Sequence, residues 1–210
     1  QATISVLSKQ VVGGEVSEDT LSTEELLYSA TLTPDLAEKE SIYQSATKRD
    51  GIWVAHNNLA AVYLEMAREN PENRAQLVQD AITQLEIAAN KSEAPEIQAN
   101  MASAYLMQGD YDQAYEALGN AEGSATNELK GDIMAAKGSI EIRQANYEQA
   151  KATLASATDT ETTFFNRGLV NILTKEYELA NGALDKATES SLAADAFYLK
   201  AVAAARSNDA

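Results

Sequence analysis

The chain has 210 residues, 16 basic and 32 acidic side chains, a formal net charge of −16, no cysteine and one histidine, His56. These counts exclude disulfides, cysteine-based metal or redox centres and histidine-rich metal clusters. The excess acid opposes binding to nucleic-acid phosphates. It is concentrated in 51–125, which has 3 basic and 11 acidic side chains, against 9 and 12 in 126–210. We interpret it as a solvated surface, with electrostatic selection against acidic partners as the alternative.

The first 21 residues differ from the rest of the chain. Two β-favouring runs, 3–7 and 9–12, precede Gly13-Gly14 and predict an extended or β-like arm over 1–21, with a flexible leader as an equal alternative. The most apolar stretch near the C-terminus, 196–205, contains Lys200 and is shorter than the roughly 20 residues of a membrane span. We therefore expect no direct insertion into a membrane.

From Leu21 onward the composition is rich in Ala, Leu, Glu and Gln, which favour helix. Breaks at Thr33-Pro34-Asp35 and at 70–73, and a cap at Ser22, divide the chain into helix-length segments. The predicted helices span 23–33, 35–49, 52–69, 74–91, 94–108, 111–123, 127–144, 147–158, 161–174, 177–189 and 192–207.

Three of these segments share one pattern. Tyr111, Tyr147 and Tyr177 each open a Tyr-x-x-Ala-x-x-x-Leu-x-x-Ala run, and they lie 36 and 30 residues apart. The helices of the other class carry Asn-Leu-Ala-x-x-Tyr at 58–63, Asn-Met-Ala-x-x-Tyr at 100–105 and a related Asn-Arg-Gly at 166–168. A period near 34 residues with these motifs resembles the tetratricopeptide repeat (TPR).

The resemblance implies an all-α fold, a right-handed α-solenoid of stacked antiparallel helix pairs with about 11 helices, over 22–210. The expected units are 22–51, 52–93, 94–126, 127–160 and 161–191, followed by a last helix at 192–207. Small residues let paired helices approach closely; on the first helices these are Ala60, Ala102, Gly138, Gly168 and Ala201. An insertion at 68–79 either lengthens both helices of its unit or forms a loop.

A second resemblance concerns the compartment. The segment 21–33, followed by Glu38-Lys39 and Ile42-Tyr43, is similar to the opening of TPR proteins of the Gram-negative, Bacteroidetes-type cell envelope, and 198–201 is similar to the same group. This implies a periplasmic or outer-membrane-associated protein. The lack of cysteine fits that compartment and the cytoplasm equally.

TPR solenoids commonly bind an extended peptide or a helix on a concave face formed by the first helices. By register, the candidate partner-binding residues are Asn57, Ala61, Leu64, Ser103, Leu106, Ser139, Ile142, Phe165, Leu169 and Tyr198. The alternative for the aliphatic residues among them is packing against neighbouring second helices. We expect Phe165, Leu169 and Tyr198 to be the exposed contacts.

The family's best-known grooves clamp a terminal carboxylate with lysine, arginine and asparagine. Here Asn58 and Asn100 are present, but the nearest bases, Arg143 and Arg206, lie far apart in the sequence. We therefore expect no carboxylate clamp, and we expect the asparagines to join adjacent helices.

Catalytic alternatives are weak. The neighbouring carboxylates Glu24/Glu25, Asp110/Asp112 and Glu176/Glu178 lie at helix starts or inter-helix turns, and His56 is expected to be a packing or partly exposed residue. No phosphate-binding or calcium-loop pattern is present. We predict no enzyme activity, no cofactor and no metal.

Two functions remain. The first is a protein-protein interaction scaffold that binds a peptide or protein segment on the concave face. The second is a structural spacer or assembly subunit of a larger envelope protein whose activity lies in flanking domains. Fold class alone does not separate them.

Overall fold

The computed structural model describes residues 18–49, 52–188 and 192–208 and divides the chain into two compact units, 1–121 (unit 1) and 122–210 (unit 2). The described residues form eleven α-helices and no strand. Most of the predicted arm, 1–21, lies outside the described residues. The part that is described is a short 3₁₀ turn, Glu18–Thr20, and Leu21, which is buried in the core of unit 1.

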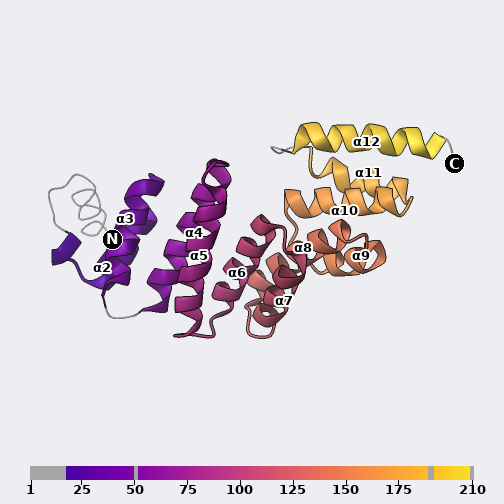
Figure 1. Cartoon of the computed structure of the whole chain (residues 1–210). Helices are drawn as coiled ribbons and strands as arrows, with labels where there is room; N and C mark the ends of the chain where they lie inside the picture. Colours follow the sequence, from indigo (N-terminus) through magenta and orange to yellow (C-terminus); the bar gives the residue numbers. More distant parts are fainter. Residues whose placement is uncertain (1–17, 50–51, 189–191, 209–210) are drawn as a thin grey trace. The chain divides into compact units, whose positions relative to one another are not determined.

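Unit 1 stacks helices that are paired along the chain (Figure 1). They are α2 (Thr23–Leu32), α3 (Leu36–Thr47), α4 (Trp53–Glu69), α5 (Arg74–Ala89), α6 (Pro95–Gln108) and α7 (Tyr111–Glu122), whose last residue begins unit 2. The insertion at 68–79 lengthens both α4 and α5, which are joined by a short turn. In that turn Nε of Arg74 donates a hydrogen bond to the carbonyl of Ala67 (3.2 Å).

Unit 2 continues the alternation with α8 (Asn127–Arg143), α9 (Tyr147–Ala155), α10 (Glu161–Leu173), α11 (Tyr177–Asp185) and α12 (Ala193–Asn208). The second helices α9 and α11 end three and four residues earlier than the predicted 158 and 189. After α9 the amide of Thr158 donates to the carbonyl of Gly131 on α8 (3.1 Å). This tertiary bond lies just beyond the end of the helix.

Helix ends follow local capping chemistry. Ser22 and Glu25 form a capping box at α2, and the Asp35 side chain accepts from the amide of Glu38 at α3. Thr126 and Thr160 cap α8 and α10 in the same way. These bonds explain why the predicted starts of these four helices agree closely with the observed ones.

One turn position recurs between first and second helices. Two residues before the tyrosines that open α7, α9 and α11, the backbone is left-handed, at Gly109 (φ 81°), Ala145 (φ 60°) and Lys175 (φ 66°). In each turn the next amide donates back to a carbonyl of the first helix, as in a Schellman ending; the amide of Asp110 reaches Tyr105, for example (2.9 Å). Only glycine adopts this conformation without steric cost.

The core lies where the small residues of the first helices meet the leucines of the second. A Cβ added at Gly138 would lie 2.5 Å from Cγ of Leu154, and the same clash arises between Gly168 and Leu184. Ala60 and Ala102, at the equivalent position in unit 1, are fully buried. The small residue at this position therefore allows the paired helices to approach closely, as the repeat predicts.

Candidate functional site

In unit 1 two of the five predicted contact residues are buried. Asn57 on α4 is 7% exposed, and its Oδ1 accepts a hydrogen bond from the Asn100 amide on α6 (3.0 Å). Leu64 is 2% exposed, so it belongs to the core and presents no side-chain surface to a partner. The remaining three, Ala61, Ser103 and Leu106, are half-buried.

In unit 2 the predicted residues are more apolar and more accessible. Ser139 and Ile142 on α8 are half-buried, and Ile142 packs beside the cluster around Leu154. Phe165 and Leu169 on α10 are half-buried, with Phe165 against the cluster that includes Leu184. Tyr198 on α12 is 69% exposed. Of the three residues expected to be exposed contacts, only Tyr198 is widely exposed; Phe165 and Leu169 keep part of their surface open.

The asparagines join helices, as predicted. Nδ2 of Asn58 donates to the Tyr43 hydroxyl across α3 and α4 (3.5 Å), and Asn100 donates to Asn57 across α4 and α6. Burial raises the pKa of the Tyr43 hydroxyl above its usual value, and the hydrogen bond from Asn58 opposes this shift.

Three basic residues have structural contacts that the sequence did not predict. The position just before the small residue of each first helix holds Lys137, Arg167 and Lys200 in unit 2. Each one bonds to the end of the preceding second helix. Lys137 pairs with Glu122 (2.5 Å), Lys200 pairs with Asp185, and Arg167 donates to the carbonyls of Leu154 and Ala157 and pairs with Asp159 (2.6 Å). The one clue in the sequence to this role is Arg167, which stands where the repeat motif has leucine.

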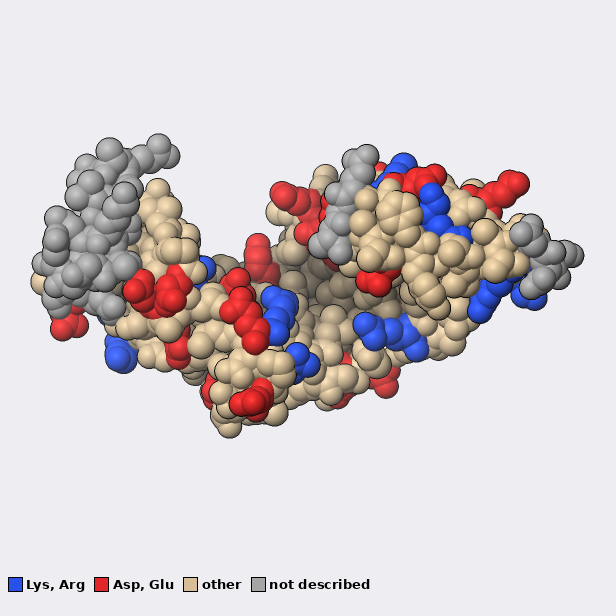
Figure 2. All heavy atoms as spheres, turned by 90° about the horizontal axis from the view of Figure 1, so that it is seen from above, with Lys and Arg blue, Asp and Glu red and all other residues tan. Residues whose placement is uncertain are grey.

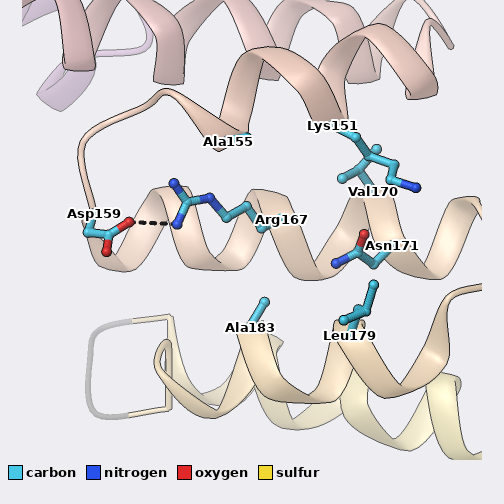
Figure 3. A pocket seen from close by; sticks show the side chains of 8 residues that line it. All are labelled: Lys151, Ala155, Asp159, Arg167, Val170, Asn171, Leu179 and Ala183. Atoms are coloured by element: carbon cyan, nitrogen blue, oxygen red, sulfur yellow. Dashed lines mark hydrogen bonds and ion pairs between the residues drawn. The ribbon is translucent and has the colours of Figure 1, made fainter.

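A cavity of about 460 Å³ lies between α9 and α11, with α10 as its floor (Figure 3). It is lined by Lys151, Ala155, Asp159, Arg167, Val170, Asn171, Leu179 and Ala183. Both cations are engaged, Arg167 as above and Lys151 with Glu176 (2.6 Å), a hydrogen bond that raises the pKa of the Lys151 ammonium. None of the ten predicted contact residues lines this cavity.

One carboxylate of each pair considered for catalysis has a structural role. The Glu25 side chain accepts from the amide of Ser22, Asp110 accepts from the amide of Gln113 at the start of α7, and Glu176 pairs with Lys151. His56 is 8% exposed, with Nδ1 2.8 Å from the Gln84 side-chain oxygen on α5, so it is a packing residue.

Among the described residues, no group of three or more metal-ligating side chains gathers, and no helix is long and apolar enough to cross a membrane. In the face shown in Figure 2, acidic and basic side chains are dispersed among uncharged ones.

Comparison with known proteins defines the fold. No family profile and no curated protein matches the chain. Solved structures do: PilF of Pseudomonas aeruginosa (TM-score 0.73, 17% identity, covering 89% of this chain and 85% of that one) and a tetratricopeptide repeat protein from Parabacteroides merdae (0.52, 16%, 96% and 98%). YrrB, described as a TPR protein with an unusual peptide-binding site, is also similar (0.56, 17%, 87% and 90%). The fold is therefore a TPR-like all-α solenoid, as the repeat predicted.

Proposed function

We propose that the chain is a non-catalytic protein-interaction scaffold that binds a peptide or helical segment of a partner along the first helices of unit 2. The observation that carries this proposal is an apolar surface on two neighbouring helices. Phe165 on α10 and Tyr198 on α12 occupy the same repeat position, and Leu169 follows Phe165 by one helical turn.

The polar chemistry nearby favours an apolar anchor over a charged one. Three basic residues of the first helices in unit 2, Lys137, Arg167 and Lys200, are held in ion pairs at or just beyond the helix ends beside them. Recognition of a partner therefore rests on aromatic and aliphatic side chains, which commonly dominate binding energy at interfaces. The similarity to TPR structures, one of them described by its peptide-binding site, supports a peptide ligand.

The test is a selection of peptides that bind the full chain, followed by calorimetric titration of the best peptide against variants. Leu169→Ala and Tyr198→Ala should each weaken binding about tenfold or more. Tyr28→Ala, which removes an exposed aromatic from α2, is the matched control and should change affinity less than twofold. Binding that ignores both substitutions in unit 2 would reject this surface.

We place the protein in the cell envelope, as a periplasmic or outer-membrane-associated component. The support is the resemblance of 21–33 to the opening of envelope TPR proteins. Fractionation of the source cells with an antibody against the chain tests this placement. Recovery in the cytoplasmic fraction alone would contradict it.

A structural spacer or assembly subunit is the second candidate, favoured by the exposed apolar side chains of α12, Phe197 and Tyr198. This role predicts that no selected peptide binds the interaction surface. It also predicts that neighbouring sequence attached to the chain raises its unfolding temperature more than any peptide does.

A further inference from the structure

One position of the first helices from α4 to α10 differs in size between the two units. It lies three residues after the small residue of each helix. In α4 and α6 it holds Tyr63 and Tyr105, and in α8 it holds Glu141. In α10 it holds the shorter Asn171, which lines the cavity of about 460 Å³ between α9 and α11 (Figure 3). The cavity therefore lies where the other repeats have a larger side chain.

In unit 1 the equivalent groove, between α3 and α5, holds the side chain of Tyr63 from α4. The Tyr63 hydroxyl accepts a hydrogen bond from Nε2 of Gln44 on α3 (3.2 Å), and the side chain packs against the core cluster of unit 1. Burial raises the pKa of this hydroxyl and the bond from Gln44 lowers it, while the carboxylates of Glu40 on α3 and Asp80 on α5 raise it further. The Tyr63 side chain thus lies between the two second helices.

The residues around Tyr63 have equivalents in unit 2. The second helices are matched by their buried residues, Tyr43 and Ala46 of α3 with Leu154 and Ala157 of α9, and Ala81 and Leu85 of α5 with Ala180 and Leu184 of α11. In this register the groove of unit 2 has Lys151, Ala155, Leu179 and Ala183 in place of Glu40, Gln44, Asp80 and Gln84. Both glutamines are replaced by alanine, which widens the cavity on both sides.

The chemistry of the cavity suits a neutral ring. Leu179, which lines it, is 62% exposed, whereas the same position of α7 and α9 holds Gln113 and Gln149. Both cations of the cavity, Lys151 and Arg167, are already paired with carboxylates. An apolar wall with a few polar groups, and no unpaired charge, favours an uncharged ligand over an anion.

We propose that this cavity binds the tyrosine side chain of a partner polypeptide, with the ring where Tyr63 lies in unit 1. The ring packs on Leu179 and on the alanines of α9 and α11. The hydroxyl lies toward Lys151, the equivalent of Glu40, whose ammonium supplies a donor where unit 1 has an acceptor. The volume of about 460 Å³ falls within the roughly 300–1,000 Å³ of ligand pockets.

The given sequence does not supply this ring. The ranges outside the described residues, 1–17, 50–51, 189–191 and 209–210, contain no phenylalanine, tyrosine or tryptophan. No described tyrosine lines the cavity. The site is also separate from the peptide-binding surface proposed above, since Phe165, Leu169 and Tyr198 are not among its lining residues.

The probe is N-acetyl-tyrosinamide, titrated into the isotopically labelled full chain and followed by NMR at the Asn171 side-chain amide and the Leu179 methyl groups. A single side chain gives a dissociation constant on the order of 1 mM, so we expect fast-exchange shifts at both residues. N-acetyl-phenylalaninamide, which lacks the hydroxyl, should bind about threefold more weakly or worse. A short peptide with one tyrosine flanked by alanines should bind at least as tightly as the tyrosine amide.

Substitutions define the site. Asn171→Tyr gives the cavity the chain's own ring, as in α4 and α6, and should abolish the shifts while unit 2 stays folded. The matched control is Asn127→Tyr, the same change at an exposed residue of α8, which should alter the dissociation constant less than about twofold. Leu179→Gln restores the residue of α7 and α9 at an exposed position and should weaken binding about threefold or more. Leu169→Ala should leave binding unchanged, so failure of the peptide-binding surface is distinguishable.

Absence of shifts at Leu179 with the tyrosine peptide overturns the proposal, as do shifts at Leu179 that persist in folded Asn171→Tyr. Binding of the tyrosine amide but not of the peptide also overturns it, because the ligand is then a small phenol. A dimer of the unliganded chain in sedimentation that Asn171→Tyr dissociates makes the occupant a second copy. Peptide binding that is lost when the sequence flanking the chain in its gene is attached makes the occupant a segment of the same polypeptide. Either result rejects a partner.

Discussion

In the first helices from α4 onward, the residue before the small residue is apolar in unit 1 and basic in unit 2. In unit 1 it is Leu59 or Met101, both buried in the core. In unit 2 it is Lys137, Arg167 or Lys200, each bonded to the end of the preceding second helix. One repeat position thus joins consecutive helix pairs either by apolar packing or by placing a cation against a helix C-terminus.

Because of this difference, the three basic residues at this position in unit 2 are engaged within the chain and are not free ligands for a partner. The sequence shows more base in 126–210 than in 51–125, which invites the interpretation of a binding surface for acid. The contacts of these three residues assign them to the joints between helices. The charge of these three residues is therefore used within the repeats.

The largest expected effect is at the apolar residue of this repeat position in unit 1. Leu59→Ala removes a side chain that is 2% exposed and leaves a cavity, which should lower the unfolding free energy of unit 1 by about 2–5 kcal/mol. Urea unfolding followed by the fluorescence of Trp53, the chain's single tryptophan, measures it. An unchanged midpoint would contradict the packing of this joint.

The next largest effect is at the basic residue of the same repeat position in unit 2. Arg167→Met keeps the aliphatic stem but removes the bonds to the Leu154 and Ala157 carbonyls and to Asp159, so unit 2 should lose about 1.5–3 kcal/mol. Hydrogen exchange at the amides of α9 and α10 measures the loss, while the Trp53 transition should stay in place as a control. Equal shifts in both readouts would show that the effect is not confined to unit 2.

The third effect is stabilising. Unit 1 has glycine at the left-handed turn position, whereas unit 2 has Ala145 and Lys175. Lys175→Gly relieves the steric cost of positive φ but increases the freedom of the unfolded chain, so we expect a gain of roughly 0.5–1 kcal/mol. Thermal unfolding measures it. Gly109→Ala should destabilise unit 1 by a similar amount, and effects of the same sign would disprove the explanation.

The smallest effect appears only at high pH. Burial raises the pKa values of Tyr43 and Tyr63 in unit 1 above the usual 10.0, so both favour the neutral form in the folded state. Their contribution is complete below pH 10 and is lost as the pH rises through the folded pKa values. Urea unfolding at pH 8–11.5 should show this decline in the Trp53 signal, and Tyr43→Phe should reduce its slope.

The sequence predicted the helices well because their boundaries are set locally. Caps at Ser22, Asp35 and Thr160 and the left-handed turns act over a few residues and can be recognised without tertiary structure. Just beyond the end of α9, a hydrogen bond joins Thr158 to Gly131, which are distant in the sequence. That contact has no local signal.

The exposure of the candidate site residues was predicted less well, because it depends on how closely the neighbouring helices cover them. Leu64 and Ile142 hold the same repeat position and have similar chemistry, yet Leu64 is buried and Ile142 remains half-buried. Periodicity identifies the face of a helix but not how closely the next helices cover it. The bonds of Arg167 were missed for the same reason, since its partners are backbone carbonyls near the end of another helix.

The basic joints also affect how the repeats depend on one another during folding. Glu122 and Asp185 each end a second helix, where the negative end of the helix dipole makes a carboxylate unfavourable. The ammonium groups of Lys137 and Lys200 neutralise these ends only once the following first helix has docked. Helices α7 and α11 are thus weakened until the following first helix is in place, which couples the folding of neighbouring repeats in a direction set by the chain.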